Sequence, residues 1–389
     1  MKYNFDEIIN REGTSSLKTD ARKRLFGTED VIPLWVADMD FMSPEEVTNA
    51  LIERSKHPVY GYTYIPESFY QSIINWIALK HNWQIKKEWI VVCPGVVPTI
   101  NMVIQAYSNP GDKVIVQPPV YYPFFSAVTN NRRELVYNQL KLENGRYYFD
   151  YENLENSIDK KTRLLILCSP HNPGGMVWTK EELKKLAEIC LQKNVLILSD
   201  EIHSDLIVNN HLHTPPATLS EEISNNTIAC YAPSKTFNIA GLSTSYVVIP
   251  DAKIRNLFQR HINNLHIGHS HVFGIVATEA AYNHGKQWLS ELLAYIEENV
   301  EFAIQFIKKN IPELSIVRPE ATFLLWIDFR KLGFTSMALK RFLIEEAKLG
   351  LSDGPVFGPG GEGFQRMNIA CPKSVLARAL NQLASALKN

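Results

Sequence analysis

The stretch RLLILCSPHNPGGMVWTKEELKKLAEICLQKNVLILSDEI (residues 163–202) decides the fold. Two strand-like stretches with apolar centres, 163–170 and 195–202, flank a segment with helical periodicity at 179–194. Thr179 begins a capping-box pattern and marks the start of that helix. Unbroken apolar strands on either side of a helix are typical of parallel strands buried on both faces. The stretch therefore predicts a strand–helix–strand unit of an α/β fold.

The same alternation continues on both sides of this stretch. Further strands are predicted at 89–95, 113–119, 134–140, 226–235 and 242–250, and helices at 44–57, 66–82, 96–108 and 124–131. We therefore expect residues 46–280 to form a large domain around a mostly parallel sheet covered by helices.

The C-terminal part of the chain has a different pattern. A long helix is predicted at 285–310, followed by a strand at 322–329, a helix at 336–349, a strand at 363–370 and a closing helix. This order predicts a smaller α+β domain over residues 281–389. The N-terminal segment, residues 1–45, has little periodicity, and we expect it to join this smaller domain.

Composition excludes several classes of protein. The chain has 389 residues, 45% of them hydrophobic, and a net charge of −1, which gives no basic footprint for nucleic acid. No run reaches the roughly 18 apolar residues that a membrane span needs, and the first residues lack the apolar core of a signal peptide. The five cysteines are scattered and form no C-x-x-C pair, so neither a disulfide framework nor a metal site is expected. These features predict a cytoplasmic globular protein with no membrane or nucleic-acid partner.

Polar residues follow several of the predicted strands at the point where each strand ends. Gly95, Asn172, Asp200 and Lys235 all stand there, and Arg366 lies inside a late strand. Ligands of open α/β sheets bind beyond the carboxyl ends of the strands, so these residues are candidates for one site.

Two of these residues suit cofactor chemistry. A lysine next to the protein interior has a readily lowered pKa and can form an imine, which makes Lys235 a candidate anchor. A carboxylate at the end of a buried strand needs a partner, and Asp200 could pair with a cationic ring nitrogen. Each has an ordinary alternative as well: a lysine reaching solvent from a strand end, and a helix cap or structural ion pair.

The remaining candidates suit other parts of a ligand. The amides of Val96 and Val97, after Gly95, begin a predicted helix and could bind a phosphate, although any strand–helix turn looks similar. Tyr121 could lie against an aromatic ring, with Tyr122 competing for that place. Two further residues have a functional and an ordinary structural interpretation. Asn172 could bond a ligand or simply belong to the turn-forming Asn-Pro-Gly-Gly. Arg366 could bind a carboxylate with two hydrogen bonds or form a strand-edge ion pair.

The order of these motifs carries more information than any one of them. SPHNPGG (169–175), LSDEIHSDL (198–206), SKTFNIAGL (234–242) and FQRMNIA (364–370) follow one another as in the fold-type I pyridoxal 5′-phosphate (PLP) enzymes, the aspartate aminotransferase superfamily. The resemblance runs over essentially the whole chain. With WVADMDF and YGYT added, the chain resembles the cystathionine β-lyase branch, also called the MalY/PatB type.

The resemblance implies a mixed, mostly parallel seven-stranded sheet and a role for each candidate. Lys235 would carry PLP as a Schiff base, Asp200 would hold its ring nitrogen, and Asn172 would bond its ring hydroxyl and border the substrate. Tyr121 would stack on the ring and is, with Lys235, a predicted catalytic residue. The predicted phosphate contacts are Gly95, Val96, Val97, Ser234 and a tyrosine lent by the neighbouring subunit of a homodimer, Tyr62.

The resemblance also assigns the substrate side. Arg366 would bind the substrate carboxylate with help from the backbone near Ala37. His203 is counted among the cofactor-binding residues, although most aminotransferases have a tyrosine there. Ala232 and Ser243 replace a serine and an arginine of the general aminotransferase pattern, so the phosphate lacks part of its usual charge balance.

The reaction implied is a β-elimination. Lys235 would remove the Cα proton of cystathionine or another cysteine S-conjugate, a thiol would leave, and pyruvate and ammonia would follow. An aminotransferase would use the same site, and some relatives also regulate a transcription factor by contact. Both alternatives stay open at the level of the sequence.

Overall fold

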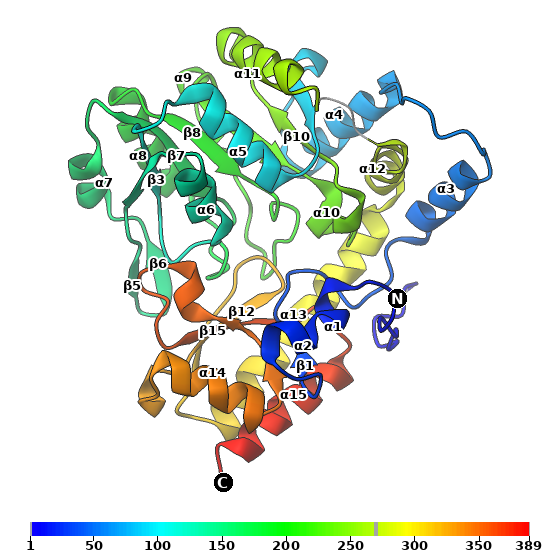
Figure 1. The fold of residues 1–389 in the computed structure, drawn as a ribbon, viewed down its shortest axis with the longest axis vertical. Coiled ribbons are helices and arrows are strands. Elements are labelled where there is room, and N and C mark those ends of the chain that lie inside the picture. The colour runs from blue at the N-terminus through cyan, green and yellow to red at the C-terminus, as the bar shows by residue number, and fades with distance from the viewer. Residues whose placement is uncertain (1, 268–270, 389) are drawn as a thin grey trace.

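A computed structural model of the protein describes residues 2–267 and 271–388. Its larger sheet has seven strands in the order β2–β10–β9–β8–β7–β3–β4 (Figure 1). Their bounds are β2 (Ile90–Cys93), β3 (Lys113–Val116), β4 (Glu134–Tyr137), β7 (Thr162–Cys168), β8 (Leu196–Asp200), β9 (Thr227–Tyr231) and β10 (Ser245–Val248). β10 is antiparallel to both neighbours, whereas the other pairs are parallel. The predicted mixed, mostly parallel sheet is confirmed.

Helices cover both faces of this sheet. One face carries α5 (Val96–Tyr107), α6 (Pro123–Asn130) and α11 (Ala252–Leu265), and the other carries α4 (Glu67–His81), α7 (Tyr151–Ser157), α8 (Lys180–Gln192) and α12 (Val272–His284). Alternate residues of β7 enter the two different apolar clusters, Leu164 on one face and Leu165 on the other. Because both faces are buried, the strands are continuously apolar, as the sequence shows.

The strand–helix–strand unit at 163–202 forms as predicted. The Thr179 side chain accepts a hydrogen bond from the Glu182 amide, and the Glu182 carboxylate accepts one from the Thr179 amide. This capping box starts α8. The unit places Cys168 and Asp200 side by side at the carboxyl edge of the sheet.

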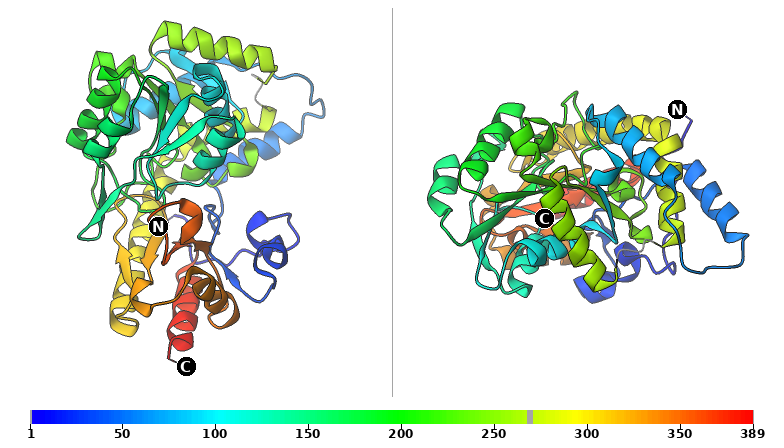
Figure 2. Two further views of the ribbon diagram at one scale, coloured as in Figure 1. Left: turned by 60° about the vertical axis from the view of Figure 1, so that its left-hand side comes forward. Right: turned by 90° about the horizontal axis from the view of Figure 1, so that it is seen from above.

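A second, smaller sheet lies beside the C-terminal helices (Figures 1 and 2). Its antiparallel strands are, in spatial order, β11 (Ser315–Val317), β12 (Leu324–Asp328), β15 (Phe364–Asn368) and β14 (Ser352–Asp353). The helices are α13 (Lys286–Asn310), α14 (Ser336–Glu345) and α15 (Lys373–Ala386). The predicted long helix, late strands and closing helix are confirmed. The domain boundaries at 45 and 280 stay predictions.

The helix predicted at 336–349 is too long. α14 ends at Glu345, and Leu349–Gly350 form β13, which pairs in parallel with β1 (Ile32–Pro33) of the N-terminal segment. Lys348 has a positive φ of 54°, which ends helical geometry before the strand begins. The strand predicted at 134–140 is likewise shorter, because β4 ends at Tyr137.

The remaining elements are short or lie near the N-terminus. They are α1 (Leu17–Asp20), α2 (Arg22–Phe26), α3 (Glu45–Ser55), the hairpin of β5 (Lys141–Glu143) and β6 (Arg146–Tyr148), α9 (Glu221–Ser224), α10 (Pro233–Thr236) and the 3-10 turns η1 (Lys87–Trp89), η2 (Pro216–Thr218), η3 (Ala240–Leu242), η4 (Arg330–Leu332) and η5 (Gly354–Phe357). All five cysteines are buried free thiols. Within residues 2–267 and 271–388, no helix has the length and apolar character needed to cross a bilayer.

Candidate active site

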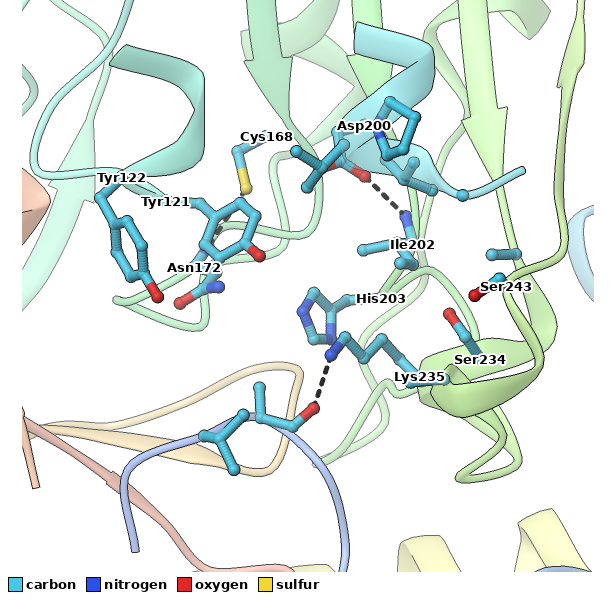
Figure 3. Close-up of a pocket in the computed structure, with 18 of the residues that line it drawn as sticks. Tyr121, Tyr122, Cys168, Asn172, Asp200, Ile202, His203, Ser234, Lys235 and Ser243 are labelled. Carbon is cyan, nitrogen blue, oxygen red and sulfur yellow. Dashed lines mark hydrogen bonds between the residues drawn. The ribbon is translucent and has the colours of Figure 1, made fainter. Parts of the chain in front are cut away.

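A cavity of about 320 Å³ opens at the carboxyl edge of the large sheet. Figure 3 shows side chains from several strand ends and from the segment around Ala37 converging on it. The predicted site residues that line it are Ala37, Gly95, Val96, Val97, Tyr121, Asn172, Asp200, His203, Ser234, Lys235 and Arg366. The fold therefore brings together residues that the sequence spreads over more than 300 positions.

Lys235 lies in α10, the short helix that follows β9. Its Nζ donates a hydrogen bond to the carbonyl oxygen of Ala37 over 2.6 Å. The residue borders the cavity, but its ammonium group is surrounded by protein, and this burial lowers its pKa to about 8. A substantial fraction of the amine is therefore unprotonated just above neutral pH, as imine formation requires.

Asp200 ends β8 and is 3% exposed. One carboxylate oxygen accepts a hydrogen bond from the Ile202 amide at 3.2 Å, and burial raises the pKa of the group to about 7. A buried carboxylate in this state gains most from a cation placed against it. The cavity is where such a cation would bind.

Arg366 and Asn172 meet at the other side of the cavity. Arg366 Nη1 donates to Asn172 Oδ1 over 2.9 Å, and Nη2 donates to the carbonyl of Trp35 over 2.8 Å and to Ser352 Oγ over 3.2 Å. Burial lowers the pKa of the guanidinium to about 10, so the group stays charged at neutral pH. An anionic group of a ligand would find here a buried, oriented cation.

The turn from β2 into α5 supplies donors of another kind. Gly95 has a φ of 142°, a conformation that side-chain-bearing residues rarely adopt, and it caps α5. The amides of Val96 and Val97 follow in the first turn, where helical N–H groups lack intrahelical acceptors. The hydroxyl-bearing residues Ser234 and Ser243 border the same cavity. This arrangement suits a phosphate.

His203 and Tyr121 complete the walls. His203 is 3% exposed, and its Nδ1 has no hydrogen-bond partner among the described residues. Burial lowers the pKa of this imidazole to about 3, so it is neutral and free to contact a ligand. Burial also raises the pKa of Tyr121 to about 12, which keeps its phenol protonated. Its ring centroid lies 5.4 Å from that of Tyr122, which lines the cavity as well.

One predicted site residue lies elsewhere in the chain. Tyr62 is fully exposed on the loop between α3 and α4, which extends away from the body of the molecule (Figure 1). Within this single chain it borders a separate surface hollow and not the cavity. Its predicted role depends on a neighbouring subunit and stays a prediction.

The structure also adds residues that sequence reasoning missed. Trp35 holds Arg366 through its backbone carbonyl, and Ser352 holds it through a hydroxyl from β14. The backbone carbonyl that contacts Arg366 thus belongs to Trp35, two positions before Ala37. The carbonyl of Ala37 itself accepts a hydrogen bond from Lys235. A backbone acceptor leaves no side-chain signal in a sequence, although the unusual WVADMDF block could have pointed to this segment.

The fold and cavity together define an α/β enzyme built around a buried lysine amine, a buried carboxylate and a buried arginine. Residues 29–383 match the family model "Aminotransferase class I and II". The chain belongs to the aminotransferase class I and II family.

Known proteins are similar over the full length of the chain. The chain is 42% identical over 385 residues to the cystathionine beta-lyase PatB of Bacillus subtilis, covering 99% of this chain and 100% of that protein. A PLP-bound protein of Clostridium difficile 630, provisionally named an aminotransferase, shares 48% identity and a TM-score of 0.97, covering 99% and 100% of the two chains. The PLP-bound C–S lyase of Staphylococcus hominis shares 32% identity and a TM-score of 0.92, covering 100% and 98%. These findings confirm the predicted family and fold.

The residues present fit PLP. The orphaned Nδ1 of His203 and the raised pKa of Asp200 both call for a ligand with polar atoms in the cavity. The capped start of α5 suits its phosphate, and the amine of Lys235 suits its aldehyde. The chain thus offers a partner for each functional group of this cofactor.

Proposed function

We propose that the protein is a PLP-dependent carbon–sulfur β-lyase that splits cysteine S-conjugates, such as cystathionine, into a thiol, pyruvate and ammonia. The observation that carries this proposal is that Lys235, Asp200 and Arg366 line one cavity. They supply an amine for the cofactor aldehyde, a carboxylate for its ring nitrogen and a cation for the substrate carboxylate. Full-length similarity to a cystathionine beta-lyase supports the choice of reaction.

Bound PLP would supply an electron-withdrawing ring that accepts the electron pair left when the Cα proton departs. Asp200 would keep the ring nitrogen protonated, because its negative charge gains most from a cation in this buried place. Asn172 and His203 offer polar atoms for the ring oxygen. The amides at the start of α5 would bind the phosphate.

On the substrate side, Arg366 would bind the α-carboxylate and so orient the amino acid. Lys235 would act as the general base for the Cα proton. Its pKa of about 8 lies close to neutral pH, where a base both accepts and releases a proton readily. Tyr121 would cover the ring and exclude water from one side.

An aminotransferase would share these residues up to removal of the proton. The two reactions then differ: a lyase lets the Cβ substituent leave, whereas an aminotransferase returns a proton and needs a keto-acid acceptor. The resemblance of the SKTFNIAGL block and of His203 to the lyase branch favours the lyase.

Product analysis tests this proposal. The purified holoenzyme is supplied with cystathionine, cysteine and S-alkyl cysteines without any keto acid. Pyruvate is measured together with the sulfur product, which is sulfide from cysteine and a free thiol from the other substrates. We expect equal amounts of both, and none from the Lys235→Ala variant. Borohydride reduction of the wild-type protein should also leave the cofactor attached to a peptide that contains Lys235. Turnover only on addition of a keto acid would identify an aminotransferase instead.

We further propose that the active form is a cytoplasmic homodimer. The loop between α3 and α4 exposes Val59, Tyr60, Tyr62 and Tyr64, an apolar surface of the kind that a partner covers. In a dimer, Tyr62 would reach the partner's phosphate-binding residues.

The proposed cytoplasmic location rests on the cysteines. The buried free thiols agree with a reducing compartment. The dimer has its own tests. Light scattering should give twice the chain mass, and Tyr62→Phe should weaken retention of PLP in dialysis; a monomer with full activity would contradict the proposal.

A further inference from the structure

The segment 35–41 lines the cavity with its first three residues, Trp35 to Ala37, and its backbone contacts both Lys235 and Arg366. The carbonyl of Ala37 accepts from Lys235 Nζ at 2.6 Å, and the carbonyl of Trp35 accepts from Arg366 at 2.8 Å. Both contacts depend only on where the backbone points. Any device that fixes this backbone therefore acts on the two residues that handle the substrate.

Two asparagines, the buried Asn368 and the partly buried Asn238, hold the segment from its flanks. Asn368 of β15 donates to the carbonyls of Val36 and Asp38, and the Val36 contact measures 2.6 Å. Asn238 accepts from the amide of Met39 at 2.9 Å and donates to its carbonyl at 3.0 Å. The segment is thus anchored to the small sheet on one side and to the residues after α10 on the other.

A group of four charged residues, Arg11, Lys18, Asp38 and Asp40, holds the segment from behind; we call it the ion cluster. Arg11 bridges Asp38 Oδ2 at 2.6 Å and Asp40 Oδ1 at 2.7 Å. Lys18 Nζ lies 2.7 Å from Asp40 Oδ2 and 3.8 Å from Asp38 Oδ1. The side chain of Lys18 is only 1% exposed, and those of the other three are about one-fifth exposed.

Stability alone is a poor explanation for this arrangement. Burying ions carries a desolvation cost that their mutual attraction only roughly offsets. An apolar cluster of equal size would therefore stabilise the fold at least equally. An ion cluster does supply direction. The carboxylates of Asp38 and Asp40 both contact Arg11 and Lys18, and holding both of them restricts the rotation of the backbone that joins them. The carbonyl of Ala37 lies directly next to this fixed stretch.

We propose that the ion cluster is a positioning device that aims the carbonyls of the segment 35–41 at Lys235 and Arg366. Arg11 and Lys18 are its positioning residues, and neither is among the described residues that line the cavity. The inference rests on the proposed function only through the roles assigned there to Lys235 and Arg366. Removing a charge of the ion cluster should make the backbone of the segment 35–41 more mobile. The affinity of Arg366 for an amino-acid carboxylate should then fall.

The test compares holoenzyme variants that remove the charge and keep an unbranched apolar side chain. Lys18→Met removes the buried ammonium, and Arg11→Met, at a partly exposed position, carries the test if the first variant does not fold. Arg22→Met is the matched control, because Arg22 lies in the neighbouring α2 but pairs with Glu12 and not with the segment. L-alanine, which has a carboxylate but no leaving group, is the probe, and its binding is followed by absorption of the bound cofactor.

We expect L-alanine affinity to fall about five- to fifty-fold in the two cluster variants, as for residues coupled in one network. Amide hydrogen exchange of residues 35–41 should speed up in the same variants and stay unchanged in Arg22→Met. Affinity for methylamine, which lacks a carboxylate, should change little. Unchanged exchange and unchanged L-alanine affinity in a folded cluster variant would overturn the proposal.

A double variant separates positioning from stability. Lys18→Met with Asp40→Asn removes one charge of each sign, so the unfolding midpoint should return towards that of the wild type. Positioning predicts that the weak L-alanine binding remains, because the link between Lys18 and the segment is still absent. If affinity returned with stability, the ion cluster would be merely structural. Because binding is scored without turnover, a failed lyase assay would leave this test intact.

Discussion

Arg366 donates a hydrogen bond from Nη1 to Asn172 Oδ1 over 2.9 Å, joining residues 194 positions apart. The group proposed to bind the substrate carboxylate is therefore in direct contact with a group proposed to bind the cofactor ring. Since Arg366 also reaches Trp35 and Ser352, its planar head is fixed by three neighbours before any substrate arrives. Such fixed geometry lowers the ordering cost of binding.

Replacing Arg366 with lysine should damage substrate binding more than folding. An ammonium cannot reproduce the fork of two parallel donors, so the variant keeps the charge and loses the geometry. A lost charge-assisted hydrogen bond of about 1.5–3 kcal/mol predicts a roughly ten- to 150-fold fall in kcat/KM, mostly through KM. Steady-state kinetics with an S-alkyl cysteine measures this. Arg330→Lys, at an exposed ion pair with Asp328, is the control, and an equal effect there would refute the assignment.

Asp200→Asn should stabilise the cofactor-free protein while impairing the enzyme. The pKa of Asp200 is about 7 in the folded protein and 3.8 ordinarily, so the folded state binds more protons between these pH values. The free energy of unfolding therefore falls as pH rises from about 4 to about 7, and the loss persists above that window. We expect the variant to gain about 2–4 kcal/mol at pH 8, measured by urea unfolding after cofactor removal. A variant less stable than the wild type at pH 8 would contradict this reasoning.

Lys235 should capture PLP with an unusual pH dependence. Only the unprotonated amine forms the covalent link, and burial lowers the pKa of Lys235 to about 8. The rate of capture by the cofactor-free protein should therefore rise through pH 8, whereas an ordinary lysine would rise near pH 10.4. Stopped-flow absorption, with Lys235→Ala as the blank, measures this rate. A profile still rising steeply above pH 9.5 would show that the amine is not buried as described.

Much of this site could be predicted because its side chains stand at strand ends. The buried strands β8 and β9 are rich in apolar residues, so their ends are visible in the sequence. Asp200 is the last residue of β8, and Lys235 follows β9 in α10. Other contacts arise from distant backbone. The pairing of Leu349–Gly350 with Ile32–Pro33 overrides local helical propensity, and nothing in a lysine predicts the positive φ of Lys348. The carbonyl of Trp35 gives no side-chain signal at all.

Two neighbouring buried tyrosines, Tyr231 and Tyr246, lie on the face of the large sheet opposite to α5 and allow a matched comparison of two hydrogen bonds. Tyr231 donates to Glu201 Oε2 at 2.6 Å, a carboxylate oxygen that His213 also contacts, whereas Tyr246 shares a 3.0 Å hydrogen bond with Tyr282. Both rings are at least 97% buried and lie stacked 5.8 Å apart. They therefore differ mainly in the charge of the acceptor.

Tyr231→Phe should consequently be the more damaging of the two changes. Loss of a hydrogen bond to a carboxylate costs about 1.5–3 kcal/mol, whereas loss of one between two hydroxyls costs about 0.5–1.5 kcal/mol. The cost is enlarged because the other oxygen of Glu201 already has no partner among the described residues. Urea unfolding of the two holoenzymes measures the difference. If Tyr246→Phe were equally or more destabilising, the hydrogen bond from Tyr231 to Glu201 would not be the stronger of the two.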